Sequence, residues 1–462
     1  MFINNPLIGG NYADPSVIRV GGDFYMTHTS YHYLPGLIIW HSRDLTHWSP
    51  VSAALYEDIG DVWAPDFVEH NGMYYIYFPA NRTNWVVSAP SPTGPWSRPV
   101  NLGIKGIDPG HAVGPDGKRY LHMSGGYFTQ LSEDGLSVIG EPKHVYEGWQ
   151  YPKDWEVEAF SLEGPKVTRR NGYYYLTVAE GGTAGPPTSH LVVSSRSRHP
   201  WGPWEHSPYN PIIRTRSAKE RWWSQGHGSL IDSPDGQWWM VYHGYMAGFH
   251  TLGRHTLIAP IEWTEDDWYK VQETGRDPLP ITSGEPYIDT FDGETPGLPW
   301  QCFGSLPSLR FGRESGVLAA EGASGDLPAS PLLYMPAHER YEAEIELSVS
   351  GDAEGRLVLY YNDDAYLGIG ASGKGVRHFR SFKIYKLEPY EGDRVFLRIR
   401  NDRNIISFYY RTDGSEWKKY DKVVDASGLH HNTFGGFLSL RVGIDAVGSG
   451  KVRFYRFSYK PE

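Results

Sequence analysis

Residues 235–240 read D-G-Q-W-W-M, a short turn followed by large apolar side chains, and the chain repeats this pattern. The other versions are G-D-F-Y-M from Gly22, N-G-M-Y-Y-I from Asn71, D-G-K-R-Y-L from Asp116 and N-G-Y-Y-Y-L from Asn171. An N-G or D-G pair that enters a run of aromatic and branched residues is a strong signal for a β-hairpin. The pattern therefore predicts five similar hairpins.

The spacing of these hairpins indicates the architecture. Their glycines are Gly22, Gly72, Gly117, Gly172 and Gly236, and successive spacings are 50, 45, 55 and 64 residues. Hairpin repeats with periods near 40 to 50 residues are typical of β-propellers, in which each blade is a four-stranded sheet. We expect an all-β fold with a five-bladed β-propeller and few helices. A β-sandwich with coincidental turns is the alternative.

The repeat stops after residues 261–264, and a different pattern follows. Residues 276–286 are rich in Pro and Gly, which predicts a linker. Farther along, Ala343, Ile345, Leu347 and Val349 alternate with glutamates, and Val395, Leu397 and Ile399 alternate in the same way. This period is typical of half-buried antiparallel strands in a β-sandwich. The expected domains are a catalytic propeller over 1–275, a linker over 276–286 and a C-terminal β-sandwich over 287–462.

Composition excludes several classes of protein. The net charge is −11 and no basic stripe is visible, which argues against a nucleic-acid partner. No apolar stretch approaches 18 residues, so no membrane span is expected. The first ten residues lack the features of a signal peptide, which favours a cytoplasmic location. The lone Cys302 excludes an intramolecular disulfide and suits a small buried apolar residue.

The repeat supplies a common frame in which equivalent positions of the blades can be compared. Nine residues before the glycine, the second to fifth blades have Trp63, Asp108, Glu163 and His227, and eight residues before Gly22 lies Asp14. The innermost strands of a propeller line its axis, so we expect these five side chains to converge. Asp66 lies three residues out of phase with this set.

Three carboxylates, an imidazole and an indole are an unusual inventory for a packing position. Each acidic residue could alone be a solvated turn residue. Buried together, they would repel one another, and at least one carboxyl pKa would rise. Carboxyls with separated pKa values suit acid/base catalysis. Glycoside hydrolysis is the natural reaction for such a set, and Trp63 would stack on a sugar ring.

Several segments together resemble glycoside hydrolase family 43. They are N-P-L-I-G-G-N-Y-A-D-P-S-V, W-A-P-D-F, G-I-D-P-G-H-A-V-G-P-D-G-K-R-Y-L, E-G-P-K-V-T-R-R-N-G-Y-Y-Y-L and G-H-G-S-L-I-D-S-P-D-G-Q-W-W-M-V-Y-H, and they cover residues 4–270 in order. The resemblance implies a five-bladed propeller with inverting chemistry. Residues 287–462 resemble the concanavalin-like β-sandwich that many such enzymes carry.

The resemblance also implies roles for single residues. Asp14 would be the general base, Glu163 the general acid, and Asp108 the residue that orients the acid and tunes its pKa. Trp63 would line the subsite for the non-reducing sugar, Arg254 would contact substrate hydroxyls, and Tyr31 would lie at the pocket mouth. His227 matches a histidine that binds calcium directly or through water in some members and only hydrogen-bonds in others. Both roles stay open for it.

We therefore expect an exo-acting inverting hydrolase that releases xylose or arabinose from short hemicellulose-derived oligosaccharides. β-Xylosidase activity is favoured, with α-L-arabinofuranosidase activity as a second activity of the same pocket. No cofactor is expected for the chemistry, and calcium in the propeller channel is an open alternative. An endo-acting arabinanase and a non-catalytic carbohydrate-binding propeller are the other functional alternatives.

Overall fold

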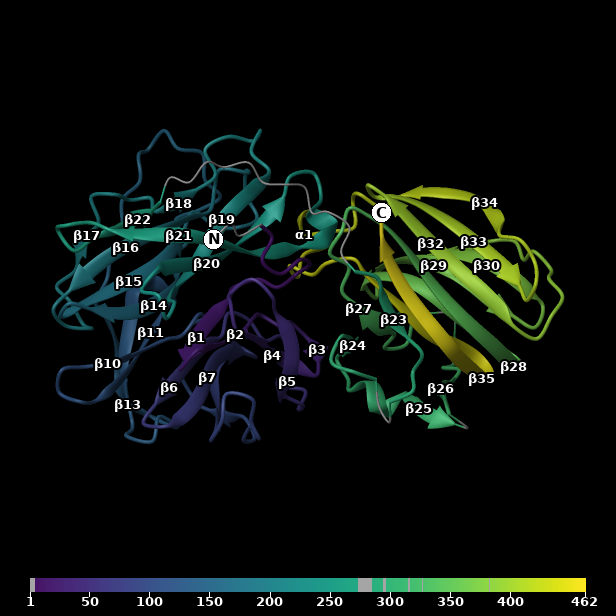
Figure 1. Cartoon of the computed structure of the whole chain (residues 1–462), viewed down its shortest axis with the longest axis horizontal. Helices are drawn as coiled ribbons and strands as arrows, with labels where there is room; N and C mark the ends of the chain where they lie inside the picture. Colours follow the sequence, from purple (N-terminus) through teal and green to yellow (C-terminus); the bar gives the residue numbers. More distant parts are fainter. Residues whose placement is uncertain (1–4, 273–284, 294–295, 315, 326, 382) are drawn as a thin grey trace. The chain divides into compact units, whose positions relative to one another are not determined.

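The computed structural model describes residues 5–272, 285–293, 296–314, 316–325, 327–381 and 383–462. They form two compact units, a β-propeller and a β-sandwich (Figure 1). The second unit also includes residues 248–253, which lie inside the range expected for the propeller. Most of the expected linker, residues 276–284, lies outside the described residues.

The propeller consists of five antiparallel sheets, each built on a meander of four strands, and the fourth sheet has a fifth short strand (Figure 1). The first blade is β1 (Ser16–Val20), β2 (Asp23–Thr27), β4 (Gly36–Ser42) and β5 (Ser49–Leu55), with β3 (Tyr33–Leu34) between β2 and β4 along the chain. The second is β6 (Asp66–His70), β7 (Met73–Ala80), β8 (Thr83–Ala89) and β9 (Val100–Asn101). The third is β10 (Gly110–Val113), β11 (Arg119–Met123), β12 (Tyr127–Leu131) and β13 (Val138–His144). The prediction of a five-bladed propeller is confirmed.

The last two blades follow the same order. The fourth is β14 (Glu163–Arg170), β15 (Tyr173–Glu180), β16 (Leu191–Ser197) and β17 (Glu205–His206), and the short β18 (Ile213–Arg214) also pairs with β16. The fifth is β19 (Trp222–Asp232), β20 (Trp238–Met246), β21 (Arg254–Trp263) and β22 (Tyr269–Val271). Leu7 and Ile8 bond to Thr256 of β21, so the N-terminal segment is attached to the fifth blade.

The hairpins that reveal the repeat are of two lengths. In the first, second and fourth blades the loop has two residues, as in the pairing of Arg170 with Tyr173. Asn71 and Gly72 both have positive φ (+52° and +77°), as a type I′ turn requires. In the third and fifth blades the loop has three residues, because Gly114 N–H donates to Lys118 O and the fifth blade has the same bond. The glycines are therefore offset by one residue between blades.

The propeller core lies between neighbouring sheets. One cluster joins the first and fifth blades and includes Phe24, Met26, Trp239 and Val241. Another joins the second and third blades through Tyr75, Tyr77 and Leu121, among others. Of the aromatics three residues after each hairpin glycine, all but Tyr25 are buried. The repeated aromatics therefore serve mainly to pack one sheet on the next.

The β-sandwich is built around two long bent strands, β28 (Arg340–Asn362) and β35 (Arg441–Pro461), which pair along most of their length. β28 pairs with β32 through its first part and with β29 through its last part, so the long strands are shared by both layers. The other elements of this unit are β23 (Tyr287–Asp289), β24 (Trp300–Phe303), β25 (Phe311–Glu314), β26 (Val317–Glu321), β27 (Leu332–Tyr334), β29 (Ala365–Ser372), β30 (Gly375–Arg380), β31 (Lys383–Ile384), β32 (Val395–Asp402), β33 (Ile405–Thr412), β34 (Lys418–Asp425) and the helix α1 (His431–Phe434).

The alternation predicted for this unit is present with one exception. Ala343, Ile345 and Leu347 are fully buried, whereas Val349 is only half-buried. Val395, Leu397 and Ile399 of β32 are fully buried as well. The glutamates on the opposite face of β28 form ion pairs with arginines of β32 and the segment before it.

Helices contribute little to the described part of the chain. Besides α1 it contains three short 3-10 turns, η1 (Ser124–Gly126), η2 (His250–Leu252) and η3 (Pro307–Leu309). None of the described helices is long and apolar enough to cross a membrane. Cys302 is buried, and burial raises the pKa of its thiol to about 12, so the thiol stays protonated.

Candidate active site

The strand register defines which positions of the five blades are equivalent. Five residue pairs occupy the same place in the first hairpin of each blade, namely Ser16–Thr27, Asp66–Tyr77, Gly110–His122, Lys166–Thr177 and Ser229–Val241. The residues two positions before the first member of each pair are Asp14, Ala64, Asp108, Gly164 and His227. Trp63 and Glu163 therefore precede the equivalent position by one residue, which corrects the frame counted from the glycines.

Four of these five positions have left-handed backbone conformations. The φ angles are +56° at Asp14, +56° at Asp108, +61° at Gly164 and +57° at His227. Such a conformation costs on the order of 1–3 kcal/mol at a residue other than glycine, and it is frequent at active sites. At Gly164 a Cβ would come within 2.9 Å of the His227 ring, so glycine is required there for space as well. The backbone is thus strained where the acidic side chains converge.

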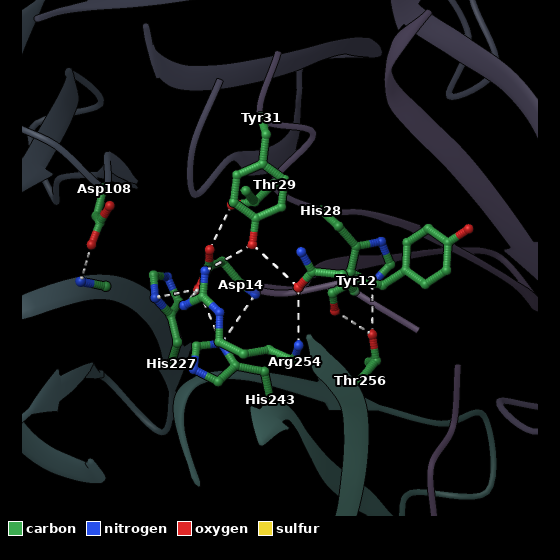
Figure 2. A network of polar contacts seen from close by, with 12 residues as sticks. Tyr12, Asp14, His28, Thr29, Tyr31, Asp108, His227, His243, Arg254 and Thr256 are labelled. Carbon is green, nitrogen blue, oxygen red and sulfur yellow. Dashed lines mark hydrogen bonds and ion pairs between the residues drawn. The ribbon is translucent and has the colours of Figure 1, made fainter. Parts of the chain in front are cut away.

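Asp14 lies at the centre of a dense polar network (Figure 2). Its Oδ2 accepts a hydrogen bond of 2.5 Å from Thr29 Oγ1. Its Oδ1 lies 3.0 Å from His243 Nδ1, 3.3 Å from His227 Nδ1 and 3.3 Å from Arg254 Nη1. Burial opposes ionisation of Asp14, but the Arg254 guanidinium and the two imidazoles outweigh it and hold the pKa well below its usual range. Asp14 is therefore ionised at neutral pH.

Arg254 is buried at the start of β21 and not on the surface. Its Nη2 donates to Tyr31 Oη at 3.1 Å, and its backbone N–H donates to Asn11 Oδ1 at 2.9 Å. Tyr31 in turn donates to Asn11 at 3.3 Å (Figure 2). These contacts fix the guanidinium beside the Asp14 carboxylate.

The expected position of Tyr31 at the pocket mouth is wrong. Its side chain is only 2% exposed and lies against Arg254 (Figure 2). The cause is local: Tyr31 has φ +50°, and its backbone pairs with Val62 of the neighbouring blade in both directions. This pairing fixes the segment in place and leaves the ring inside the network.

Asp108 and Glu163 differ from Asp14 in their charge state. Asp108 Oδ2 accepts a hydrogen bond of 2.9 Å from the N–H of Gly164, the residue after Glu163 (Figure 2). Burial, followed by the charges of Asp108 and Asp14, raises the pKa of Glu163 to about 8. Burial and the charge of Asp14 raise the pKa of Asp108 to about 7. Glu163 therefore holds a proton at neutral pH and remains partly accessible to solvent.

His227 belongs to a group of buried imidazoles. The rings of His227 and His243 are 6.0 Å apart, and His190 stacks on His243 at 5.3 Å. Burial lowers the pKa of His227 to about 3, so the ring is neutral. Its Nδ1 faces Asp14, and its Nε2 has no hydrogen-bond partner among the described residues.

These imidazoles do not fit the expected alternative of a calcium site. Calcium prefers six to eight oxygen ligands, and His227 offers one nitrogen. Within the described ranges there is no group of three or more His, Cys, Asp or Glu side chains that could hold a metal ion. Direct coordination of calcium by a cage of side chains is therefore not supported.

A buried ion pair links the strands that present the acidic residues. Lys166 Nζ donates to Asp66 Oδ1 at 2.9 Å and to Pro65 O at 2.6 Å. Asp66 Oδ2 accepts the backbone N–H of His111 at 2.7 Å, and Ser16 Oγ donates to Asp66 Oδ1 at 3.4 Å. Asp66, in the second blade, thus contacts groups of the first, third and fourth blades. It holds β6, β10 and β14 together directly after Trp63, Asp108 and Glu163.

Trp63 presents an open aromatic face. Its side chain is 41% exposed, although its backbone N–H is held by Pro79 O at 3.1 Å. An indole exposed next to a buried polar centre can stack on an apolar ring face.

Sequence reasoning missed two contacts of Asp14, from Thr29 and His243. Both lie seven residues after the hairpin glycine of their blade. The equivalent residues in the five blades are Thr29, Pro79, Ser124, Ala179 and His243. The same repeat frame, counted forward, would have found them.

The geometry supports acid/base chemistry. One ionised carboxylate, Asp14, lies close enough to one protonated carboxyl, Glu163, to influence its pKa. Such a pair can accept a proton from water and donate a proton to a leaving oxygen.

Comparisons with known proteins find glycosidases among the relatives of this chain. A non-reducing end alpha-L-arabinofuranosidase of Bacteroides ovatus is 34% identical over 64% of this chain and 60% of its own length. A xylan 1,3-beta-xylosidase of a Vibrio species is 33% identical over 60% of this chain and 58% of its own length. The chain thus spans about three fifths of the length of these relatives. A xylosidase/arabinosidase of Humicola insolens is 27% identical, and the match covers 99% of this chain and 98% of that protein.

Solved structures and family models extend the comparison to both units. A family 43 protein of Bacillus licheniformis superposes with a TM-score of 0.88 at 28% identity, covering 100% of both chains. A model described as "Beta xylosidase C-terminal Concanavalin A-like domain" matches residues 289–460. A model described as "Glycosyl hydrolases family 43" matches residues 3–269. The chain belongs to glycoside hydrolase family 43.

Proposed function

We propose that this chain is an exo-acting, inverting glycosidase that releases xylose or arabinose from the non-reducing end of short hemicellulose-derived oligosaccharides. β-Xylosidase activity is favoured, with α-L-arabinofuranosidase activity in the same pocket. The single observation that carries the proposal is the opposite displacement of two carboxyl pKa values, with Asp14 held ionised and Glu163 held protonated. The names of the relatives, which include xylosidases, arabinosidases and a non-reducing end arabinofuranosidase, support the substrate class.

In the proposed mechanism Asp14 is the general base. Its carboxylate accepts a proton from water as the water attacks the anomeric carbon, and Thr29, His243 and Arg254 hold it in one orientation. Because Arg254 stabilises its negative charge, Asp14 remains ready to act at neutral pH. His227 Nδ1 lies 3.3 Å from the same carboxylate.

Glu163 is the proposed general acid. It donates its proton to the glycosidic oxygen as the bond to the anomeric carbon breaks, and the charge of Asp108 helps to keep that proton in place beforehand. Asp108 also fixes the backbone beside Glu163 through Gly164. The sugar would lie against Trp63, and Arg254 would contact its hydroxyls. Tyr31 acts through Arg254 and does not touch the substrate.

The proposal includes a location and a cofactor requirement. The enzyme would act in the cytoplasm on imported oligosaccharides, and the chemistry would need no cofactor. The comparisons do not favour an endo-acting arabinanase or a non-catalytic propeller.

Hydrolysis of 4-nitrophenyl β-D-xylopyranoside and 4-nitrophenyl α-L-arabinofuranoside, measured side by side, tests the proposal. Asp14→Ala is the matched control because it removes the base and leaves Glu163 in place. We expect activity in the wild type and none in the variant, and the ratio of kcat/KM assigns the sugar. NMR of the first product should show the inverted anomer. A folded wild type that is silent on both substrates, or a fully active Asp14→Ala, would refute the proposal.

A further inference from the structure

We infer that Tyr151, Trp155 and Phe160, which precede Glu163 in the chain, form an aromatic platform for the leaving-group sugar. The inference rests on the proposed function and makes it more specific. It assigns the substrate a leaving group with its own sugar ring, as in an oligosaccharide, in preference to a small alcohol.

The three rings pack together through Tyr151. Tyr151 and Trp155 are parallel, with an interplanar angle of 4° and ring centroids 6.5 Å apart. Tyr151 and Phe160 are 5.9 Å apart at 38°. Phe160 is 47% exposed, so this group of rings is open to solvent at one end. Single exposed apolar residues are ordinary on protein surfaces, and it is the grouping of rings close to the proposed acid that suggests a binding surface.

The platform is supported from behind. The Arg214 guanidinium lies 3.3 Å from the centroid of the Trp155 ring, and the Trp149 ring lies 6.0 Å from it. The N–H of Trp149 donates to Glu180 Oε1 at 2.7 Å, which ties the segment to the end of β15. These contacts hold the rings in place before any ligand arrives, so little ordering is needed on binding.

The segment is also fixed next to the proposed acid. Phe160 lies three residues before Glu163, and the intervening Leu162 accepts the N–H of Gly125 at 2.7 Å. Ahead of Phe160, the N–H groups of Glu158 and Ala159 donate to Gly181 O at 3.0 and 3.3 Å. The charge of Glu158 raises the pKa of Glu163 and that of Tyr245, so this segment reaches the same polar centre.

The identity of the ligand follows from the geometry of acid catalysis. A general acid must come within about 2.6–3.2 Å of the atom that it protonates, here the oxygen that departs with the leaving group. The leaving group therefore lies beside Glu163. A sugar ring has an apolar face of C–H groups, and an exposed aromatic ring binds such a face by stacking. Trp63 is the proposed contact of the sugar that is released, so Phe160 is left for the sugar that departs.

Two substrates that differ only in the leaving group test the inference. The leaving group of xylobiose is a sugar ring. The leaving group of β-D-xylopyranosyl fluoride is a fluoride ion, which is too small to contact the aromatic platform. The corresponding arabinofuranose pair replaces them if the 4-nitrophenyl assay assigns arabinose. Phe160→Ala removes the exposed ring, and Phe160→Tyr keeps it. Tyr127→Ala is the matched control, because Tyr127 is also 47% exposed but lies on a different element, β12.

We expect Phe160→Ala to lower kcat/KM on the disaccharide about 3- to 10-fold and to leave kcat/KM on the fluoride within about twofold of the wild type. Phe160→Tyr and Tyr127→Ala should behave like the wild type on both. An equal loss on both substrates would show a structural defect and overturn the inference, as would an unchanged disaccharide rate. A wild type that is silent on both substrates would instead refute the proposed function on which the inference depends.

Discussion

Asp108→Asn should shift the pH dependence of activity by a definite amount and direction. Glu163 must be protonated to act as an acid, so kcat/KM of the wild type should fall as the pH rises through about 8, the value near which Glu163 loses its proton. The charge of Asp108 is the first cause of this raised pKa after burial. Asn removes the charge and keeps an oxygen that can accept the N–H of Gly164. The variant therefore isolates the electrostatic role of Asp108.

The magnitude follows from Coulomb's law. Two unit charges about 6 Å apart interact by about 2.8 kcal/mol at an effective dielectric constant near 20, which corresponds to about 2 pKa units. Asp108 itself has a pKa of about 7 and is not fully ionised over the whole range. We therefore expect the alkaline limb to move by about 1 unit, from near pH 8 to near pH 7.

The assay is kcat/KM on xylobiose between pH 5 and 9, because a poor leaving group makes the rate depend on protonation. Glu158→Gln is the matched control, since Glu158 also raises the pKa of Glu163 but is the last of the contributing charges. It should move the limb by less than about half a unit. An alkaline limb that stays in place in Asp108→Asn, or that moves to higher pH, would refute the electrostatic argument.

Three further outcomes follow from the described contacts. Glu163→Ala should lower kcat on xylobiose by a factor of about 10²–10⁴. It should lower kcat on a 4-nitrophenyl glycoside far less, because 4-nitrophenolate needs little protonation to leave. Equal losses on both substrates would contradict the role of Glu163 as the acid. Lys166→Met should destabilise the propeller by about 3–5 kcal/mol in urea unfolding, because the Asp66 carboxylate would remain buried without its ion-pair partner. The double variant Asp66→Asn/Lys166→Met should recover most of this loss. A double variant that is no more stable than the single variant would contradict the argument. Burial raises the pKa of Glu180 to about 8, above its value in the unfolded chain, so its contribution to stability is complete below about pH 4.5 and is lost as the pH rises toward 8. Glu180→Gln should therefore gain about 3–4 kcal/mol relative to the wild type between pH 5 and pH 8, and a gain that does not depend on pH would contradict this reasoning.

The sequence predicts the propeller well because hairpins depend on local rules. N-G and D-G pairs need positive φ values, and the strands that follow need alternating apolar residues, so both signals lie within a few neighbouring positions. The alternation in β28 and β32 is local in the same sense, and Val349 is the one predicted inward residue that is only half-buried. These features require no knowledge of which segments meet in space.

The site could be predicted in part, and the error has a physical cause. Asp14, Asp108 and His227 occupy equivalent positions, whereas Trp63 and Glu163 lie one residue earlier because hairpin loops differ in length. The three-residue loops carry Pro before Asp-Gly, as in P-D-G at residues 115–117 and 234–236, so a closer analysis of turn chemistry would have corrected the frame.

Other residues could not be identified from local patterns. Asp66 and Lys166 occupy equivalent positions of two blades that are 100 residues apart in the chain, and a repeat frame cannot say which equivalent residues will touch. The spacing from the hairpin glycine puts Asp66 out of phase with the acidic residues. It lies two residues after Ala64, the equivalent position in its blade, where its carboxylate contacts neighbouring blades.

The division of labour among the three carboxylates follows from where the protein places Arg254. Arg254 contacts Asp14 directly and lies farther from Asp108 and Glu163, for which its charge is a lesser contribution. Burial raises the pKa of all three groups, and only Asp14 has enough positive charge beside it to reverse that effect. Once Asp14 is ionised, its charge helps to keep protons on the other two. Removing the charge of Arg254 should therefore impair Asp14 as a base and, because Asp14 would then hold a proton itself, also lower the pKa of Glu163.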